Sequence, residues 1–354
     1  MKFIHYSLFV VLSFIVYSCK PKTVGKTDEF KKTELLNQLA ENYILPEYKH
    51  LQENINDLSN SWTVFENQPS KSQFDTLIAQ WKKAYIRFQY VKMFDFGPGM
   101  NQNLAMNLGT FPTDTLKVES NIISKNYNLN SITNYVAIGF PALEYLFYSK
   151  DAYQKITTDN DRKNYARYLI IKMKTDIDKT VSEWSTYSNS FMDGSSNAST
   201  SPFSLLINNF IRDYEILKWT KLGYPLGVNT LNVKNPAYLE ARKSGIGKEL
   251  LRANILALQQ VYHGKGSNGK NGKSMHDYLL ALGKTTTATT IETNWGVFLT
   301  QIDGLPTSLE TALDSDTQKM IDLYNAIHYN TIALKTDMVS AFGILITYSD
   351  NDGD

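Results

Sequence analysis

Hydrophobic residues recur at spacings of three and four along most of the chain, a period that predicts amphipathic α-helices. The stripes lie at residues 48–62, 74–91, 165–184, 203–217, 246–261, 291–298 and 320–338. Narrow stripes of this kind suit helices that pack in bundles at shallow crossing angles. We therefore expect an all-α fold, built of two helical-bundle halves packed against each other.

Two stretches interrupt this pattern. Residues 187–202, "YSNSFMDGSSNASTSP", are rich in Ser, Asn and Gly and favour a boundary between the halves. Near the end of the chain, "GILITY" predicts either a short strand or an extended tail. The expected organisation is a signal peptide at 1–18, a tether at 19–28, an N-terminal bundle at 29–186, a linker at 187–202 and a C-terminal bundle at 203–354.

The first twenty residues, "MKFIHYSLFVVLSFIVYSCK", have the pattern of a secretory signal. Lys2 precedes an apolar run, and small residues follow that run, which is too short for a comfortable membrane span. Cys19, the only cysteine in the chain, resembles the lipidated cysteine of a bacterial lipobox. We expect Cys19 to anchor the protein to a membrane through lipid. Because Lys20 replaces the aspartate that marks inner-membrane retention, we expect the outer membrane, facing the periplasm.

Composition narrows the classes of function. The chain has 36 basic and 35 acidic residues, and removing the signal peptide with Lys2 leaves 35 of each. A neutral chain without basic runs is a poor candidate for binding nucleic acid. After cleavage before Cys19, no other cysteine would remain. Disulfides, thiolate catalysis and zinc–sulfur sites are therefore excluded from the expected mature domains.

A single acid interrupts the apolar, aromatic stretch "NYVAIGFPALEYLFYSK". On a helix, the residues three and four positions from Glu144 are aromatic or proline, so none can pair with it. Such a carboxylate needs a distant partner, a cation or a proton. Pro141 suits the first turn of this helix, and Gly139 suits the bend before it. Glu144 is therefore the first candidate for a functional side chain.

Several segments resemble the imelysin-like proteins, which are bacterial envelope proteins grouped with a metallopeptidase family. "IGFPALEYLFY" is similar to the family's signature Gly-x-His-x-x-Glu segment. The other matching segments follow in the family's order: "WKKAYIRFQYVKMFDFGP", "KLGYPLGV", "PAYLEARKSGIGKELLRANILALQQVYHG" and "YSDNDGD". The resemblance covers nearly all of the expected mature chain.

The resemblance implies an all-helical, two-part fold with a site in the cleft between the halves, export, and an association with iron uptake. Gly139 and Glu144 match the motif, but Pro141 stands where the family has its metal-binding histidine. Glu144 is then the metal-ligand candidate that remains, and Glu240 and Ser244 of the fourth segment are candidates to complete a ligand site. The cofactor stays open between a divalent metal and iron.

We therefore expect a lipid-anchored envelope protein that binds a ligand or metal in a cleft between two bundles, with iron or haem uptake components as partners. Two alternatives remain. One is a metallopeptidase that takes its missing metal ligand from elsewhere in the chain. The other is a scaffold that holds partner lipoproteins at the membrane without pocket chemistry. We assign no catalytic residues.

Overall fold

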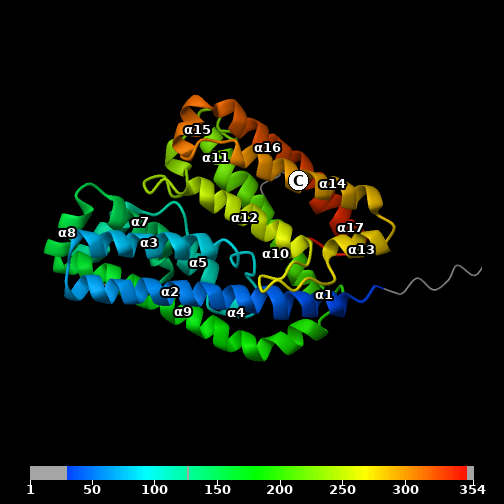
Figure 1. The fold of residues 1–354 in the computed structure, drawn as a ribbon, viewed down its shortest axis with the longest axis horizontal. Coiled ribbons are helices and arrows are strands. Elements are labelled where there is room, and N and C mark those ends of the chain that lie inside the picture. The colour runs from blue at the N-terminus through cyan, green and yellow to red at the C-terminus, as the bar shows by residue number, and fades with distance from the viewer. Residues whose placement is uncertain (1–29, 126, 349–354) are drawn as a thin grey trace, which may run out of the picture. The chain divides into compact units, whose positions relative to one another are not determined.

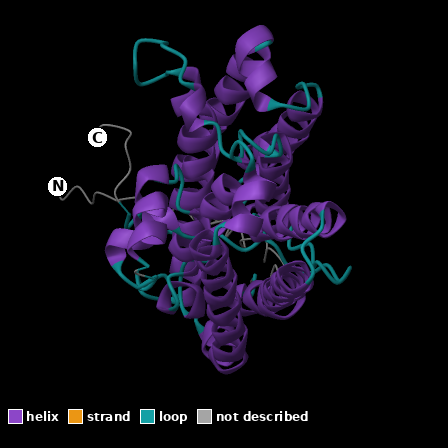
Figure 2. Ribbon diagram, turned by 90° about the vertical axis from the view of Figure 1, so that its left-hand side faces the viewer, coloured by secondary structure: helices purple, strands orange, loops and turns teal. Residues whose placement is uncertain are grey.

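The structure is a computed structural model that describes residues 30–125 and 127–348. The predicted signal peptide, the tether with Cys19 and the acidic "DNDGD" end lie outside these residues. The described chain contains helices, turns and loops and no strand, so the all-α prediction is confirmed (Figure 2). Segment 344–348 is non-helical and is held by Asn208, whose side chain donates to Leu345 O (3.0 Å) and accepts from Thr347 N (2.8 Å).

The helices before residue 194 form the first part of the described chain (Figure 1). They are α1 (Lys32–Leu39), η1 (Ala40–Ile44), α2 (Leu45–Asn67), α3 (Lys71–Phe88), α4 (Pro98–Asn101), α5 (Leu104–Gly109), α6 (Thr115–Ser124), η2 (Ile132–Ala137), α7 (Gly139–Tyr148), α8 (Ala152–Thr158) and α9 (Asn160–Asp193). The helix α2 packs along both α3 and α9, and α7 packs against α3 and α9.

The helices after residue 201 form the second part. They are α10 (Pro202–Ile216), η3 (Leu217–Gly223), α11 (Tyr224–Leu226), η4 (Pro236–Tyr238), α12 (Gly247–Tyr262), α13 (Met275–Ala281), α14 (Thr285–Asp303), α15 (Leu309–Ser315), α16 (Thr317–Thr331), η5 (Ile332–Met338) and α17 (Val339–Phe342). The helix α14 packs against α12 and α16.

The predicted stripes supply the core. In α2, α3 and α9, nearly all the stripe residues are buried, and Trp81 of α3 and Trp184 of α9 have no exposed surface. Trp295 of α14 likewise has no exposed surface. Burying aromatic side chains of this size removes a large apolar area from water on folding. The helical period in the sequence therefore marks the faces that hold the fold together.

Two prolines lie inside continuous helical stretches, each just after a π-helical turn. Pro46 follows η1 and Pro225 follows η3. Pro46 is the second residue of α2, although the continuous helical stretch that contains it begins at Lys32. A proline lacks the N–H that would bond the preceding turn and collides with its carbonyl. In the wider π turn, neither the missing N–H nor the clash with the carbonyl interrupts the helix, so the helix continues.

The segment between the predicted halves is partly helical. The helix α9 continues to Asp193, and α10 begins at Pro202. By its contacts, the described chain from Lys31 onward forms one compact unit. Contacts cross between the parts before and after this segment, since α3 packs against α12 and α9 against α10. The proposed boundaries between the halves stay a prediction.

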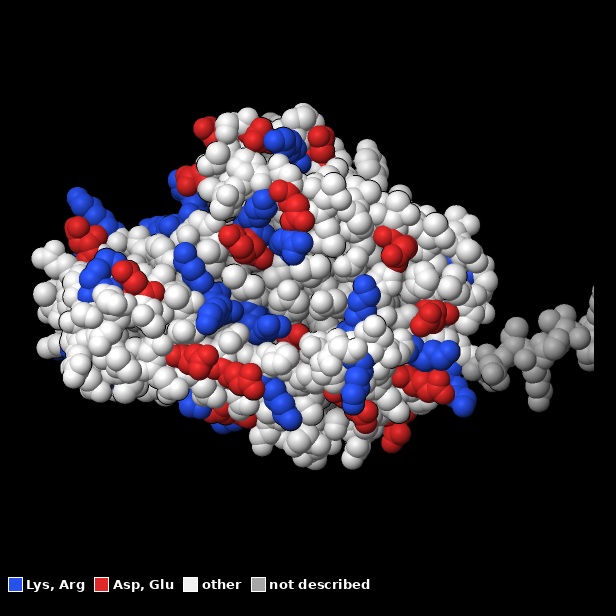
Figure 3. Space-filling view, in the orientation of Figure 1, with Lys and Arg blue, Asp and Glu red and all other residues white. Residues whose placement is uncertain are grey.

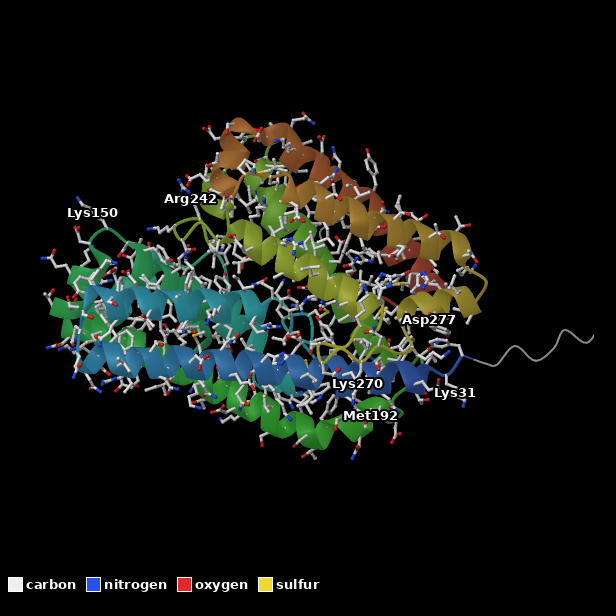
Figure 4. The ribbon with its side chains drawn as sticks, viewed as in Figure 1. Lys31, Lys150, Met192, Arg242, Lys270 and Asp277 are labelled. Atoms are coloured by element: carbon white, nitrogen blue, oxygen red, sulfur yellow. The ribbon has the colours of Figure 1, made fainter. Side chains whose placement is uncertain are left out.

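Charged side chains of both signs are interspersed over the face in Figure 3, as expected for a chain with balanced charge. Among the described helices, none combines the length and the apolar character needed to cross a bilayer. The loop at residues 264–274 lies against α1: Gln38 donates to Gly264 O (2.9 Å) and Lys270 O (2.6 Å) (Figure 4).

Candidate functional site

The helix α7 begins with a glycine that lies tightly against α5. Gly139 has φ +77°, and a Cβ there would lie 2.5 Å from Leu108 O and 2.6 Å from Asn107 O. Only glycine combines this left-handed backbone with such close contact. Pro141 lies in the first turn, as predicted, where its missing N–H costs no hydrogen bond. Gly139 therefore sets the direction in which α7 presents Glu144.

Glu144 is 7% exposed and is held by a residue one hundred positions away. Its Oε1 accepts one hydrogen bond from Ser244 N and one from Ser244 Oγ, each 2.8 Å long. Within the described residues, no Lys, Arg or His lies at ion-pair distance from Glu144. Burial raises the pKa of Glu144; the two Ser244 donors oppose the rise, and the Glu240 carboxylate adds to it.

This raised pKa predicts a pH effect on stability. The folded state holds the Glu144 proton at pH values where the unfolded chain has released it, so the free energy of unfolding falls as pH rises from 4.5 through the raised pKa. Glu144→Gln should remove this contribution and gain stability relative to the native chain as pH approaches neutrality. Urea unfolding across this window would measure it.

The exposed change Glu53→Gln is the control for the substitution itself and should leave the free energy of unfolding within about 0.5 kcal/mol of that of the native chain. A Glu144→Gln profile parallel to that of the native chain would contradict the assignment of a buried, titrating Glu144.

Glu240 lies in a fully bonded polar cluster. Its Oε1 accepts from Tyr85 Oη (2.7 Å), and its Oε2 forms an ion pair with Lys221, which also donates to Gln89 Oε1 (3.0 Å). The Lys221 and Glu240 side chains are 5% and 13% exposed. Burial alone would raise the pKa of Glu240, but the Lys221 ammonium and the Tyr85 hydroxyl outweigh it and lower that pKa. Glu240 is therefore an anion.

Glu240 and Ser244 lie in a run of turns and not on a helix. Residues 240–245 form turns in which Ala241 has φ +54° and Gly245 has φ +74°. These turns direct Ser244 to Glu144 and Glu240 to Tyr85 and Lys221. The Glu240 carboxylate contributes to the raised pKa of Glu144, so the two acids influence each other electrostatically. They nevertheless have different partners.

A cleft of about 310 Å³ opens beside Glu240, and we call it the Glu240 cleft. Its wall combines residues from both sides of segment 187–202, and the polar ones include Lys92, Asp95, Arg212, Thr220, Lys221 and Glu240. Glu144, Ser244 and Gly139 are not part of this wall. Of the predicted ligand-binding residues, only Glu240 therefore faces the space in which a ligand would lie.

The charges of the Glu240 cleft are arranged as ion pairs. Arg212 contacts Asp95 at 2.8 Å, and Lys92 contacts Asp213 at 2.5 Å. Asp213 also accepts from Asn254 Nδ2 at 2.6 Å. With Lys221 and Glu240, the cleft wall therefore carries cations and anions that can recognise a ligand by its charged groups, while Asp213 lies buried behind Lys92.

The family model described as imelysin (Peptidase_M75) matches residues 44–334. The chain belongs to the imelysin family. Among solved structures it is similar to an imelysin-like protein from Psychrobacter arcticum, with 17% identity, a TM-score of 0.71, and coverage of 90% of this chain and 98% of that one. It is also similar to a "putative iron-regulated protein A precursor" from Parabacteroides distasonis, with 15% identity, a TM-score of 0.73, and coverage of 90% and 97%.

These two likenesses show that the fold is shared. Among curated proteins, none matches this sequence.

The metal site that the imelysin family implies does not fit the residues of this chain. Pro141 occupies the histidine position of the motif, and Glu144 Oε1 already accepts two hydrogen bonds. Within residues 30–125 and 127–348, no three His, Cys, Asp or Glu side chains are grouped to hold a metal ion. A zinc-type site normally takes three protein ligands. Glu144 as a metal ligand stays a prediction that this geometry does not support.

Sequence reasoning missed most of the polar residues of the Glu240 cleft. Lys92 and Asp95 interrupt the aromatic run "FQYVKMFDFGP", and Lys221 precedes the "GYPLG" turn. A charge inside an apolar run was the signal that identified Glu144, and it would have found Lys92 and Asp95 as well. No local signal reveals that Lys221 pairs with Glu240, because nineteen positions separate them in the chain.

Proposed function

We propose that this imelysin-family protein is an exported, lipid-anchored envelope protein that binds a ligand carrying charged groups in the Glu240 cleft. The observation that carries the proposal is the ionised Glu240, which is bonded to Tyr85 and Lys221 on the wall of the cleft. Its position is fixed before any ligand arrives. Such preorganisation lowers the entropy cost of binding.

The Arg212–Asp95 ion pair on the cleft wall supports the proposal that the ligand is charged. Arg212 and Asp95 line the cleft with side chains that are 46% and 20% exposed. A ligand could therefore reach them and exchange contacts with them. Lys92 and Lys221 are almost buried, with side chains 11% and 5% exposed. They supply a fixed positive field behind the Arg212–Asp95 pair.

An iron-related ligand is consistent with this chemistry if the iron brings its own ligands. One similar structure carries the description "putative iron-regulated protein A precursor". Because the described residues offer no three-residue metal cluster, we propose chelated iron or haem rather than a bare ion. The same observation makes the metallopeptidase alternative less favourable, since its metal needs protein ligands. The scaffold alternative predicts no saturable ligand.

Isothermal titration calorimetry tests this function with ferric citrate, haem, ferrous, zinc and calcium ions as probes. We expect a saturable site for at least one chelated form of iron. Arg212→Gln should weaken that binding at least about tenfold, because the carboxylates of citrate or haem would lose an exposed cation on the cleft wall. Arg242→Gln, in the exposed Arg242–Glu310 pair, is the matched control and should bind as the native chain does (Figure 4). No saturable heat with any probe would refute the proposal.

We also propose that lipid on Cys19 holds the protein at the outer membrane, facing the periplasm. Cys19→Ser should move the protein from the membrane fraction to the soluble periplasmic fraction, because a single acyl-bearing residue supplies the anchor. Fractionation with immunoblotting measures this. An unchanged distribution would refute lipid anchoring.

A further inference from the structure

A second hollow lies in the segment that joins Lys221 to Glu240. Its volume is about 540 Å³, within the range of roughly 300–1,000 Å³ typical of small-molecule sites. It is lined chiefly by Tyr224, Asn229, Thr230, Val233, Asn235 and Tyr238. We call it the tyrosine pocket. None of these residues belongs to the wall of the Glu240 cleft.

The backbone of the tyrosine pocket is fixed by its own hydrogen bonds. Gly227 O accepts from Thr230 N (2.8 Å) and Asn232 N (2.9 Å), and Asn235 N donates to Pro225 O (2.9 Å). Gly227 has φ +76°, and a Cβ there would lie 2.2 Å from Val233 O. The loop is therefore closed tightly around glycine, and its hollow does not depend on a ligand to form.

The same loop holds unfavourable features in solvent. Leu231 has φ +53° and Asn232 has φ +62°. This left-handed backbone region is energetically unfavourable for a bulky residue such as leucine. Leu231 is 96% exposed, and Val233, on the pocket wall, is 66% exposed. Backbone strain persists where the surrounding structure imposes it, and exposed apolar surface often marks a binding site. A ligand over Val233 would cover part of this surface.

The lining offers aromatic faces and neutral hydrogen-bonding groups. The rings of Tyr224 and Tyr238 lie with centroids 5.8 Å apart at 55°, and Tyr238 is 39% exposed. Asn229 and Asn235 add amides, and an amide can donate and accept at once. Within the loop, Asn235 Oδ1 accepts from Ala237 N (3.0 Å), and the Thr230 hydroxyl donates to Gly227 O (3.2 Å). The one charged residue of the lining is Lys234. Its ammonium already donates to Leu313 O (2.9 Å) and Thr317 Oγ1 (2.6 Å).

We propose that the tyrosine pocket binds a neutral carbohydrate. The C–H faces of a sugar ring carry partial positive charge and pack on the negative face of an aromatic ring. Neighbouring sugar hydroxyls pair with asparagine amides, which supply a donor and an acceptor together. The Lys234 ammonium directs two of its three N–H groups to α15 and α16, so the lining offers a ligand mainly neutral hydrogen-bonding groups. The pocket thus differs in ligand chemistry from the charged Glu240 cleft.

The carbohydrate could come from the cell-wall glycan, whose sugars are N-acetylated, or from an external neutral glucan. Chitotetraose and maltotetraose represent these two sources. Titration of the full chain with each, followed by calorimetry, should give saturable binding of at least one. The better binder identifies the source. Failure of both sugars to bind would overturn the proposal.

Substitutions locate the binding. Tyr238→Ala should weaken it about tenfold, because the ring face is lost, and Tyr238→Phe should retain it within about threefold. Tyr168→Ala is the matched control, since Tyr168 is 40% exposed and its ring also has a tyrosine neighbour, Tyr127, at 5.0 Å. It should bind as the native chain does. Tyr238→Ala that folds, by its circular dichroism, and binds sugar with native affinity would overturn the proposal.

Discussion

Replacing Gly139 with alanine should lower the free energy of unfolding by about 3 kcal/mol. An alanine at φ +77° pays for a left-handed backbone, and its Cβ meets the Leu108 and Asn107 carbonyls at 2.5 and 2.6 Å. These are backbone atoms, so they can retreat only if α5 and α7 move apart. Chemical denaturation followed by circular dichroism would measure the loss.

Gly296 provides the matched control for this substitution. It lies within α14, and a Cβ there would meet no atom within 4 Å. Gly296→Ala should therefore raise stability by about 0.5–1 kcal/mol, the gain expected in an exposed helix interior. Equal effects at Gly139 and Gly296 would contradict the view that Gly139 is required by the close approach of α5.

Replacing Glu240 with glutamine should lower the free energy of unfolding by about 3 kcal/mol. Lys221 would remain buried with its charge and with neutral amide oxygens, those of Gln89 and of the new glutamine, in place of its ion-pair partner. Removing one partner of a buried ion pair leaves an uncompensated charge in a region of low dielectric constant. Urea unfolding of the variant at neutral pH would measure the loss.

Two further variants separate this cause from a general loss of packing. Lys221→Met added to Glu240→Gln should recover part of the stability, because no unpaired charge remains. Glu310→Gln breaks an ion pair whose side chains are 44% and 45% exposed, and it should cost less than about 1 kcal/mol. A double variant that is less stable than Glu240→Gln alone would contradict the ion-pair explanation.

The helical architecture could be predicted because it depends on the local spacing of hydrophobic residues. The period of three and four marked the faces that α2, α3 and α9 bury, and Pro141 and Gly139 marked the start of α7. The π turns before Pro46 and Pro225 were not predictable from that period, since they shift the helical register without changing which residues are apolar. Tertiary packing decides whether a proline ends a helix or is accommodated within it.

The candidate site could be predicted only in part. A lone acid in an apolar run identified Glu144, and the family resemblance brought Glu240 and Ser244 together with it. The sequence could not show that Ser244 would hold Glu144 away from the cleft, or that Tyr85 and Lys221 would hold Glu240 on the cleft wall. These contacts join distant parts of the chain, and they depend on turns at Ala241 and Gly245 that no periodicity describes.

Protection of a single engineered thiol tests most directly whether the Glu240 cleft is the ligand site. Cys19 is the only cysteine, so Thr220→Cys in a full chain carrying Cys19→Ser places one thiol on the cleft wall. Thr287→Cys, half-buried on α14, is the matched control. An iron compound that calorimetry shows to bind should slow maleimide labelling at position 220 and leave the labelling rate at position 287 unchanged. Saturating probe that leaves the labelling rate at position 220 unaltered would contradict the account.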